Sequence, residues 1–164
     1  MALFGLFGGS KDEAPRNDQL DHWIEDTLKR ELELDEVERD DDGDIPLDCG
    51  STMVYVRTLD VESDLPLIRV FAPLLAKFEM KPAVYEALNS INRKTVLAKA
   101  IVDPAIPQIL LFADIFVFGE ISPWQLMSTI ELVGENADQY DTMLQKRFGG
   151  TTMFDDDADG EFNV

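Results

Sequence analysis

Cysteine and histidine are almost absent from this chain, which has one of each in 164 residues. Cys49 has no second cysteine with which to form an internal disulfide, and His22 alone cannot build a zinc site or a histidine relay. The sequence also lacks a glycine-rich phosphate loop and a plausible nucleophile with a base beside it. These absences disfavour redox, metal and hydrolytic chemistry, so we expect no cofactor, no metal and no enzymatic activity.

Long hydrophobic runs are also missing. The apolar stretch at residues 1–9 is shorter than the roughly 18 residues that a membrane-spanning helix needs, and no basic residue precedes it. We therefore expect a cytoplasmic protein without membrane insertion. Leu3, Phe4, Leu6 and Phe7 within this stretch are compatible with a flexible tail or with a short hydrophobic segment that docks on the body of the protein or on a partner.

Positive charge is scarce, with 14 basic against 33 acidic residues and a formal net charge of −19. The acids are concentrated at the two ends, because residues 1–50 hold 16 acids against 5 bases and residues 123–164 hold 9 against 2. The middle, residues 51–122, is nearly neutral, with 8 acids and 7 bases. This balance disfavours nucleic acid and anionic membranes as partners.

The length corresponds to one domain, which we expect at residues 18–150 between a flexible tail at 1–17 and an acidic tail at 151–164. Two acidic runs invite a calcium interpretation. The run Asp40 to Asp44 lacks the ligand spacing of a known loop, and Asp155, Asp157 and Asp159 are not followed by the required glutamate. We expect solvated acids at both places.

Three helices are predicted from their boundaries and apolar stripes. The first begins at Asn17 or Asp18, and the second opens at Pro82, because proline is tolerated in the first turn of a helix. The third begins with Ser122 as N-cap and ends at Gly149-Gly150. Its heptad-like apolar stripe predicts packing on a sheet or pairing with a second copy.

Alternating hydrophobicity predicts strands at residues 45–49, 53–58 and 66–73, and a long hairpin at 94–119 that turns at 103–107. A short strand and turn are expected within residues 35–44. The fold class is therefore α+β, an antiparallel sheet with helices packed on one face.

The two faces of the predicted sheet differ in composition. One is aliphatic, as in Val96, Ala98, Ala100 and Val102, and suits burial under helices. The other, which we call the mixed face, sets isolated charges among large apolar groups, a composition typical of protein interfaces. Its candidate binding residues are Tyr55, Arg57, Arg69, Phe71, Leu97, Lys99, Phe112, Asp114 and Phe116.

Several occupants of the mixed face are compatible with the sequence. The three basic residues could receive an acidic or amphipathic peptide of a partner. Alternatively, the chain's own tail or a second subunit could cover the face, with Arg69 and Lys99 paired to Asp114 within the sheet. A different class of function, a small-ligand sensor with a pocket between sheet and helix, is also open, although no polar groups converge on the aliphatic face to fix a ligand.

Short signatures carry a family resemblance: Ala87-Leu88-Asn89 followed by Asn92, the helix start Ser122-Pro123-Trp124-Gln125, and the helix exit at residues 144–150. Over roughly residues 20–154 the chain resembles the YbjN-like group of bacterial proteins, which is related in fold to class I type III secretion chaperones of the CesT and Tir-chaperone kind. Asn89 and Asn92 also have a structural explanation, as amides that cap the helix end or bond to the following strand.

The resemblance implies the element order α-β-β-β-α-β-β-α, or the same order with an additional strand, and frequent homodimers. It also implies chaperone members that bind extended segments of another protein, and relatives labelled sensory transduction regulators. We therefore expect a non-enzymatic, chaperone-like adaptor that binds a segment of a partner protein through the mixed face.

Overall fold

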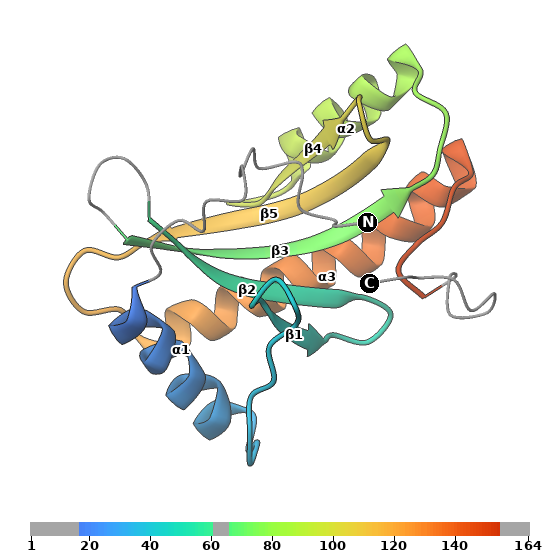
Figure 1. Ribbon diagram of the computed structural model, residues 1–164. Coiled ribbons are helices and arrows are strands. Elements are labelled where there is room, and N and C mark those ends of the chain that lie inside the picture. The colour runs from blue at the N-terminus through green and yellow to red at the C-terminus, as the bar shows by residue number, and fades with distance from the viewer. Residues whose placement is uncertain (1–16, 61–65, 155–164) are drawn as a thin grey trace.

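The computed structural model describes residues 17–60 and 66–154, which form three helices and one five-stranded antiparallel sheet (Figure 1). The elements are α1 (Asp18–Glu31), β1 (Ile45–Asp48), β2 (Met53–Asp60), β3 (Pro66–Ala76), α2 (Pro82–Lys94), β4 (Lys99–Asp103), β5 (Gln108–Phe116) and α3 (Pro123–Phe148). This succession confirms the expected α+β class and the order α-β-β-β-α-β-β-α. None of the helices among the described residues combines the length and apolar character that crossing a membrane requires.

The strands lie in the order β1-β2-β3-β5-β4, so β3 is central and β1 and β4 are the edges. The register between β3 and β5 sets Arg69 opposite Asp114 and Phe71 opposite Phe112. An irregularity follows between Pro73 and Leu75, where proline cannot donate to the ladder.

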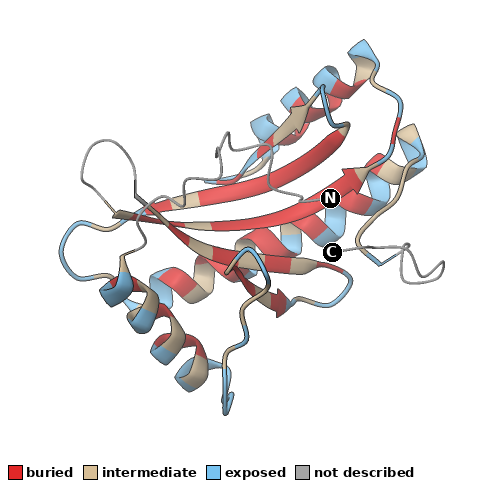
Figure 2. Ribbon diagram, viewed as in Figure 1, coloured by how far each residue is buried: buried red, intermediate tan, exposed pale blue. Residues whose placement is uncertain are grey.

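The three helices contact the sheet from the aliphatic side, α3 along β3 and its neighbours, α2 against β4 and α1 against β2 (Figure 1). Alternating residues of the strands, such as Val54, Ile68, Val70 and Leu111, are fully buried beneath them. In Figure 2 most of β3 and β5 is red. Hydrophobic contact with the sheet therefore stabilises the helices. Because all three helices lie on this side, no helix of the described residues covers the other face of the sheet.

The ends of α3 follow the predicted chemistry. The Ser122 side chain accepts a hydrogen bond from the Gln125 amide at 3.2 Å, and Gly149 ends the helix with a φ of 69°. Gly150 has a φ of 86°, and a Cβ there would lie 2.4 Å from the Ala76 carbonyl oxygen. The two glycines thus let the chain turn back so that Thr151 pairs with Ala76 at the end of β3. Thr151, expected as the first residue of the acidic tail, is in contact with the folded body.

Two details of the predicted strands are wrong. The first strand of the long hairpin begins at Lys99 instead of residue 94, because α2 continues to Lys94 and Leu97 takes a left-handed backbone with a φ of 65°. Val96, expected in the core, is 69% exposed as a result. The strand expected within residues 35–44 is absent, and this segment is a loop that ends in a turn closed by the Gly43 amide and the Asp40 carbonyl.

The side chain of Asn92 explains how α2 and β4 are joined. Its Nδ2 donates to the Ala100 carbonyl oxygen at 3.0 Å, and its Oδ1 accepts from the Ala100 amide at 2.6 Å. One amide side chain thereby satisfies both backbone groups of a residue in edge strand β4, as a neighbouring strand would. This confirms the structural explanation for Asn92, while Asn89 is exposed.

Candidate functional site

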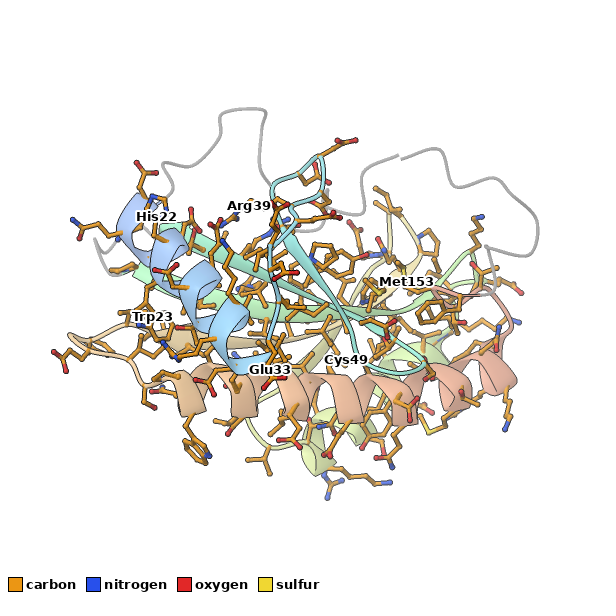
Figure 3. All side chains as sticks on the ribbon, turned by 90° about the horizontal axis from the view of Figure 1, so that it is seen from below. His22, Trp23, Glu33, Arg39, Cys49 and Met153 are labelled. Atoms are coloured by element: carbon orange, nitrogen blue, oxygen red, sulfur yellow. The ribbon has the colours of Figure 1, made fainter. Side chains whose placement is uncertain are left out.

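The candidate site is the mixed face of the sheet, opposite the helices. Figure 3 shows α3 below the sheet and the loop that carries Arg39 above it. Eight of the nine predicted residues lie on strands β2, β3, β4 and β5, at positions that alternate with the helix-covered core. Leu97 is the exception, because it precedes β4 and is 74% exposed in the connection from α2. The strand position expected for Leu97 is wrong, and its role in binding stays a prediction.

At the centre of the mixed face, Arg69 joins a carboxylate to an aromatic ring. Its Nε and Nη2 donate to the two carboxylate oxygens of Asp114 at 2.6 and 2.7 Å, the planar two-point geometry that strengthens such pairs. The same guanidinium lies over the Phe112 ring, 4.5 Å from its centroid. Of the two pairs with Asp114 that the self-covering alternative included, the one from Arg69 is therefore present, whereas Lys99 lies 5.9 Å from the centroid of the same ring.

A second unit of the same kind lies toward β1. Arg57 donates from Nε to Asp44 at 2.6 Å, with a second contact from Nη2 to the other carboxylate oxygen. Its guanidinium lies 5.2 Å from the centroid of Phe71, and the Tyr55 ring stacks on Phe71 at the same centroid distance. The mixed face is thus a row of planar groups, in which each arginine is held flat by one carboxylate and one ring.

Asp44 is the member of the site that sequence reasoning missed. It was assigned to a solvated turn, but it is fully buried under Arg57. Its backbone amide donates to the Asp40 side chain at 2.8 Å, which fixes the turn that delivers it. Burial raises the pKa of Asp44, Arg57 partly opposes this rise, and Asp40 and Asp42 add to it. Asp44 precedes β1, and its partner Arg57 lies on β2. No local sequence pattern marks a pair that is formed between these two segments.

The negative charges of Asp40 and Asp44 also act on Tyr55. Burial raises the pKa of its phenol, and the negative charges of Asp40 and Asp44 add to the rise. The ring therefore stays neutral and serves as a stacking surface.

The charge balance of the face differs from the one expected. The sequence suggested a basic trio able to receive an acidic or amphipathic peptide, and in the structure Arg57 and Arg69 are each paired with a buried or half-buried carboxylate. The face therefore has flat, polarisable groups and less net positive charge than the sequence suggested.

Burial divides the face into a centre and a rim. Four apolar side chains are almost completely buried although they lie opposite the helices: Leu67, Phe71, Leu110 and Phe112. Phe116 at the end of β5 is 49% exposed, and its ring lies 6.1 Å from that of Phe118. The rim therefore offers exposed aromatic surface beside a buried apolar centre.

The cavities outside the mixed face include one at α1 and one at α3. One of about 490 Å³ lies between the start of α1 and the β5–α3 connection, lined by residues that include Asn17, Pro66 and Val117. The other, of about 540 Å³, lies between Cys49 and α3, where Gly134 allows a close approach to the thiol. Burial raises the pKa of Cys49, which lowers its nucleophilicity.

Among residues 17–60 and 66–154, no three His, Cys, Asp or Glu side chains are grouped as metal ligands. The acids at Asp155, Asp157 and Asp159 lie outside the described residues. His22 is exposed on α1 (Figure 3).

The family is shown by a sequence model that matches residues 18–156: the chain belongs to the family described as T3SS (YopN, CesT) and YbjN peptide-binding chaperone 1. This confirms the resemblance seen in the sequence. No curated protein matches the chain significantly.

Solved structures share the fold. The chain is similar to one in the crystal structure of the ExsC-ExsE complex, with a TM-score of 0.57 and 14% identity over 77% of this chain and 94% of the other. It is similar to one in the structure of the Yersinia pestis type III secretion chaperone SycH with a fragment of YscM2, with a TM-score of 0.51 and 16% identity over 72% and 97%. YbjN from E. coli, a putative transcription regulator, matches with a TM-score of 0.50 and 13% identity over 81% and 93%.

Proposed function

We propose that this protein is a non-enzymatic, chaperone-like adaptor that binds a peptide segment of a partner protein on the mixed face. The family description names peptide-binding chaperones, and two similar structures, of ExsC with ExsE and of SycH with YscM2, are complexes with a second protein. A small-ligand sensor is the less favoured alternative, because the family description does not support it and the two cavities at α1 and α3 are lined mostly by apolar surface.

The observation that carries the proposal is the row of stacked planar groups formed by Arg57, Phe71, Arg69 and Phe112. Arginine and aromatic side chains dominate binding energy at interfaces because they bury much surface with few rotatable bonds. Here the carboxylates of Asp44 and Asp114 fix the orientation of Arg57 and Arg69 before any ligand binds, which reduces the entropy lost on binding. The preferred ligand is a segment with aromatic or aliphatic side chains.

The sheet edges argue for docking on the face in place of strand addition at β4. Pairing with an incoming strand would need the outward backbone groups of β4, but Asn92 already occupies those of Ala100. At the other edge, β1 has only four residues and includes Pro46, which lacks an amide proton.

The test removes exposed rim groups, so that the fold is preserved. We expect the double variant Phe116→Ser, Lys99→Glu to lose cross-linked partner protein in pull-downs from the native cell, while its circular dichroism and melting temperature stay close to those of the wild type. The matched control is Tyr85→Ser on α2, which is 52% exposed on the helical side and should retain the partner.

The assignment of the binding site is contradicted if the Tyr85→Ser control loses the partner to the same extent. It is also contradicted if the Phe116→Ser, Lys99→Glu variant retains the partner. A thermal-shift screen against metabolites tests the alternative, since clear stabilisation by one compound would favour a ligand sensor.

A further inference from the structure

The mixed face contains a second buried apolar cluster. Leu67, Phe71, Leu110 and Phe112 are 3%, 1%, 0% and 9% exposed. None of the four belongs to the main core cluster, which unites the aliphatic face with the helices. The helices therefore do not account for the burial of this second cluster, because it lies on the side of the sheet that the described helices do not reach.

Burial of this degree requires a cover above the face. Neighbours on adjacent strands, such as Tyr55 beside Phe71, shield the flanks of a side chain, and Arg57 and Arg69 lie over the Phe71 and Phe112 rings. The side chains of Arg57 and Arg69 are themselves only 18% and 13% exposed, so they too lie beneath a cover. The described chain after α3 reaches only one end of the face, where Met153 lies near Pro73 and Gln108. The burial of the centre, around Phe71, Phe112 and the two arginines, is therefore completed by a further group.

The sequence offers one segment of suitable chemistry. Residues 1–9 carry no charged side chain and hold Leu3, Phe4, Leu6 and Phe7, whereas residues 155–164 hold five acids and residues 61–65 hold two. Because the arginines of the face are already paired with carboxylates, an uncharged segment fits it better than an acidic one. We propose that residues 3–7 lie over Leu67, Phe71, Leu110 and Phe112 as an internal occupant of the binding face.

The chain enters the fold at a point from which the segment reaches the face. Asn17, the N-cap of α1, lines a cavity with Pro66 at the start of β3 and Val117 just after β5. The nine residues at positions 8–16 can span up to about 30 Å when extended. A five-stranded sheet is about 19 Å wide between its outer strands, so the tether is long enough.

This inference rests on the proposed function, because it assigns a competitor to the same face. A tethered segment acts at a high effective concentration, so a partner peptide must displace it, and binding is weaker than for the open face. Residues 3–7 thus regulate access to the site.

Cross-linking in the full chain tests the placement directly. In a Cys49→Ala background, we compare Gly5→Cys with Lys99→Cys, which lies beside the Phe112 ring, against Gly5→Cys with Tyr85→Cys on α2. A short bismaleimide should link the first pair within one molecule roughly tenfold more efficiently than the second. Equal linkage of both pairs would overturn the proposal. Links between two molecules would also overturn it and would assign the cover to a second copy.

A second measurement uses the hydrophobic dye bis-ANS. The variant Phe4→Ser, Phe7→Ser should bind several-fold more dye than the wild type, because the apolar centre becomes accessible, and should exchange the amides of β3 and β5 faster. Its matched control, Phe162→Ser in the acidic tail, should behave as wild type. Unchanged dye binding in the first variant would contradict the proposal, as would an increase in the control alone.

The two proposals fail in different ways. If Phe4→Ser, Phe7→Ser opens the face but no variant captures a partner, the internal occupant stands and the adaptor function falls. If partner capture depends on Phe116 and Lys99 while dye binding and cross-linking do not depend on residues 3–7, the adaptor function is supported and the internal occupant is contradicted.

Discussion

The two faces of the sheet bury apolar groups by different physical means. Beneath the helices, aliphatic side chains such as Val70 and Leu111 make non-directional contacts that any well-packed hydrocarbon would satisfy. On the mixed face, Phe71 and Phe112 are packed against guanidinium planes whose orientation is fixed by hydrogen bonds to carboxylates. The first arrangement holds the fold together, and the second presents a surface of defined shape and charge.

The difference shows why one strand can serve both purposes. In β3, Ile68 and Val70 alternate with Arg69 and Phe71, so neighbouring residues belong to different environments. A substitution on one face can therefore be compared with a substitution one residue away on the other, in the same strand and at the same place in the sheet.

The largest effect is expected from breaking the buried charge pair. Arg57→Met would leave Asp44 buried without its counter-charge, and we expect a loss of about 3–5 kcal/mol in unfolding free energy. Urea denaturation measures it. The control Arg30→Met removes a 59% exposed partner of Glu31 and should change stability by less than about 0.5 kcal/mol. Similar values for the two variants would mean that Asp44 gains no more from its partner than a surface acid does.

A pair of neighbours in β5 compares the two faces directly, because Leu110 and Leu111 are both fully buried on opposite sides. Leu111→Ala should cost about 3 kcal/mol, since helices and sheet relax little around the cavity. Under the proposal that residues 3–7 cover this face, Leu110→Ala should cost about half as much, because a tethered segment can settle into the space. Equal losses in urea denaturation would indicate a cover as rigid as the helices.

A smaller effect is expected at the second arginine. Arg69→Met leaves Asp114 partly accessible to water, with 22% of its side chain exposed, so we expect a loss of about 1 kcal/mol. The same denaturation experiment measures this loss. A cost equal to that of Arg57→Met would contradict the division of the face by burial.

The smallest effect concerns pH. Because burial raises the pKa of Asp44, the folded state holds its proton more tightly than the unfolded state does. The contribution of Asp44 to stability should therefore fall as pH rises from the ordinary aspartate pKa through the raised one. The difference in unfolding free energy between wild type and Asp44→Asn, followed across weakly acidic buffers, should show this slope. A difference that stays constant or rises with pH would contradict it.

Much of the fold could be predicted because its signals are local. Alternation along each strand separated Val54 and Val56 from Tyr55 and Arg57, and Ser122-Pro123 marked the start of α3. The failure in the long hairpin lies where a local pattern continued across a boundary. Residues 94–98 alternate like a strand, but α2 continues to Lys94, and Asn92 bonds to Ala100 at the start of β4.

The sequence by itself determined the element order, the helix ends and the unlike composition of the two faces, because these depend on spacings of a few residues. Only the tertiary structure decided that Arg57 pairs with Asp44, that Arg69 lies between Asp114 and Phe112, and that four apolar side chains of the mixed face are buried. Those facts depend on the register between strands and on a loop that returns to the sheet. The register between strands and the path of this loop depend on the assembled chain, so no single stretch of sequence specifies them.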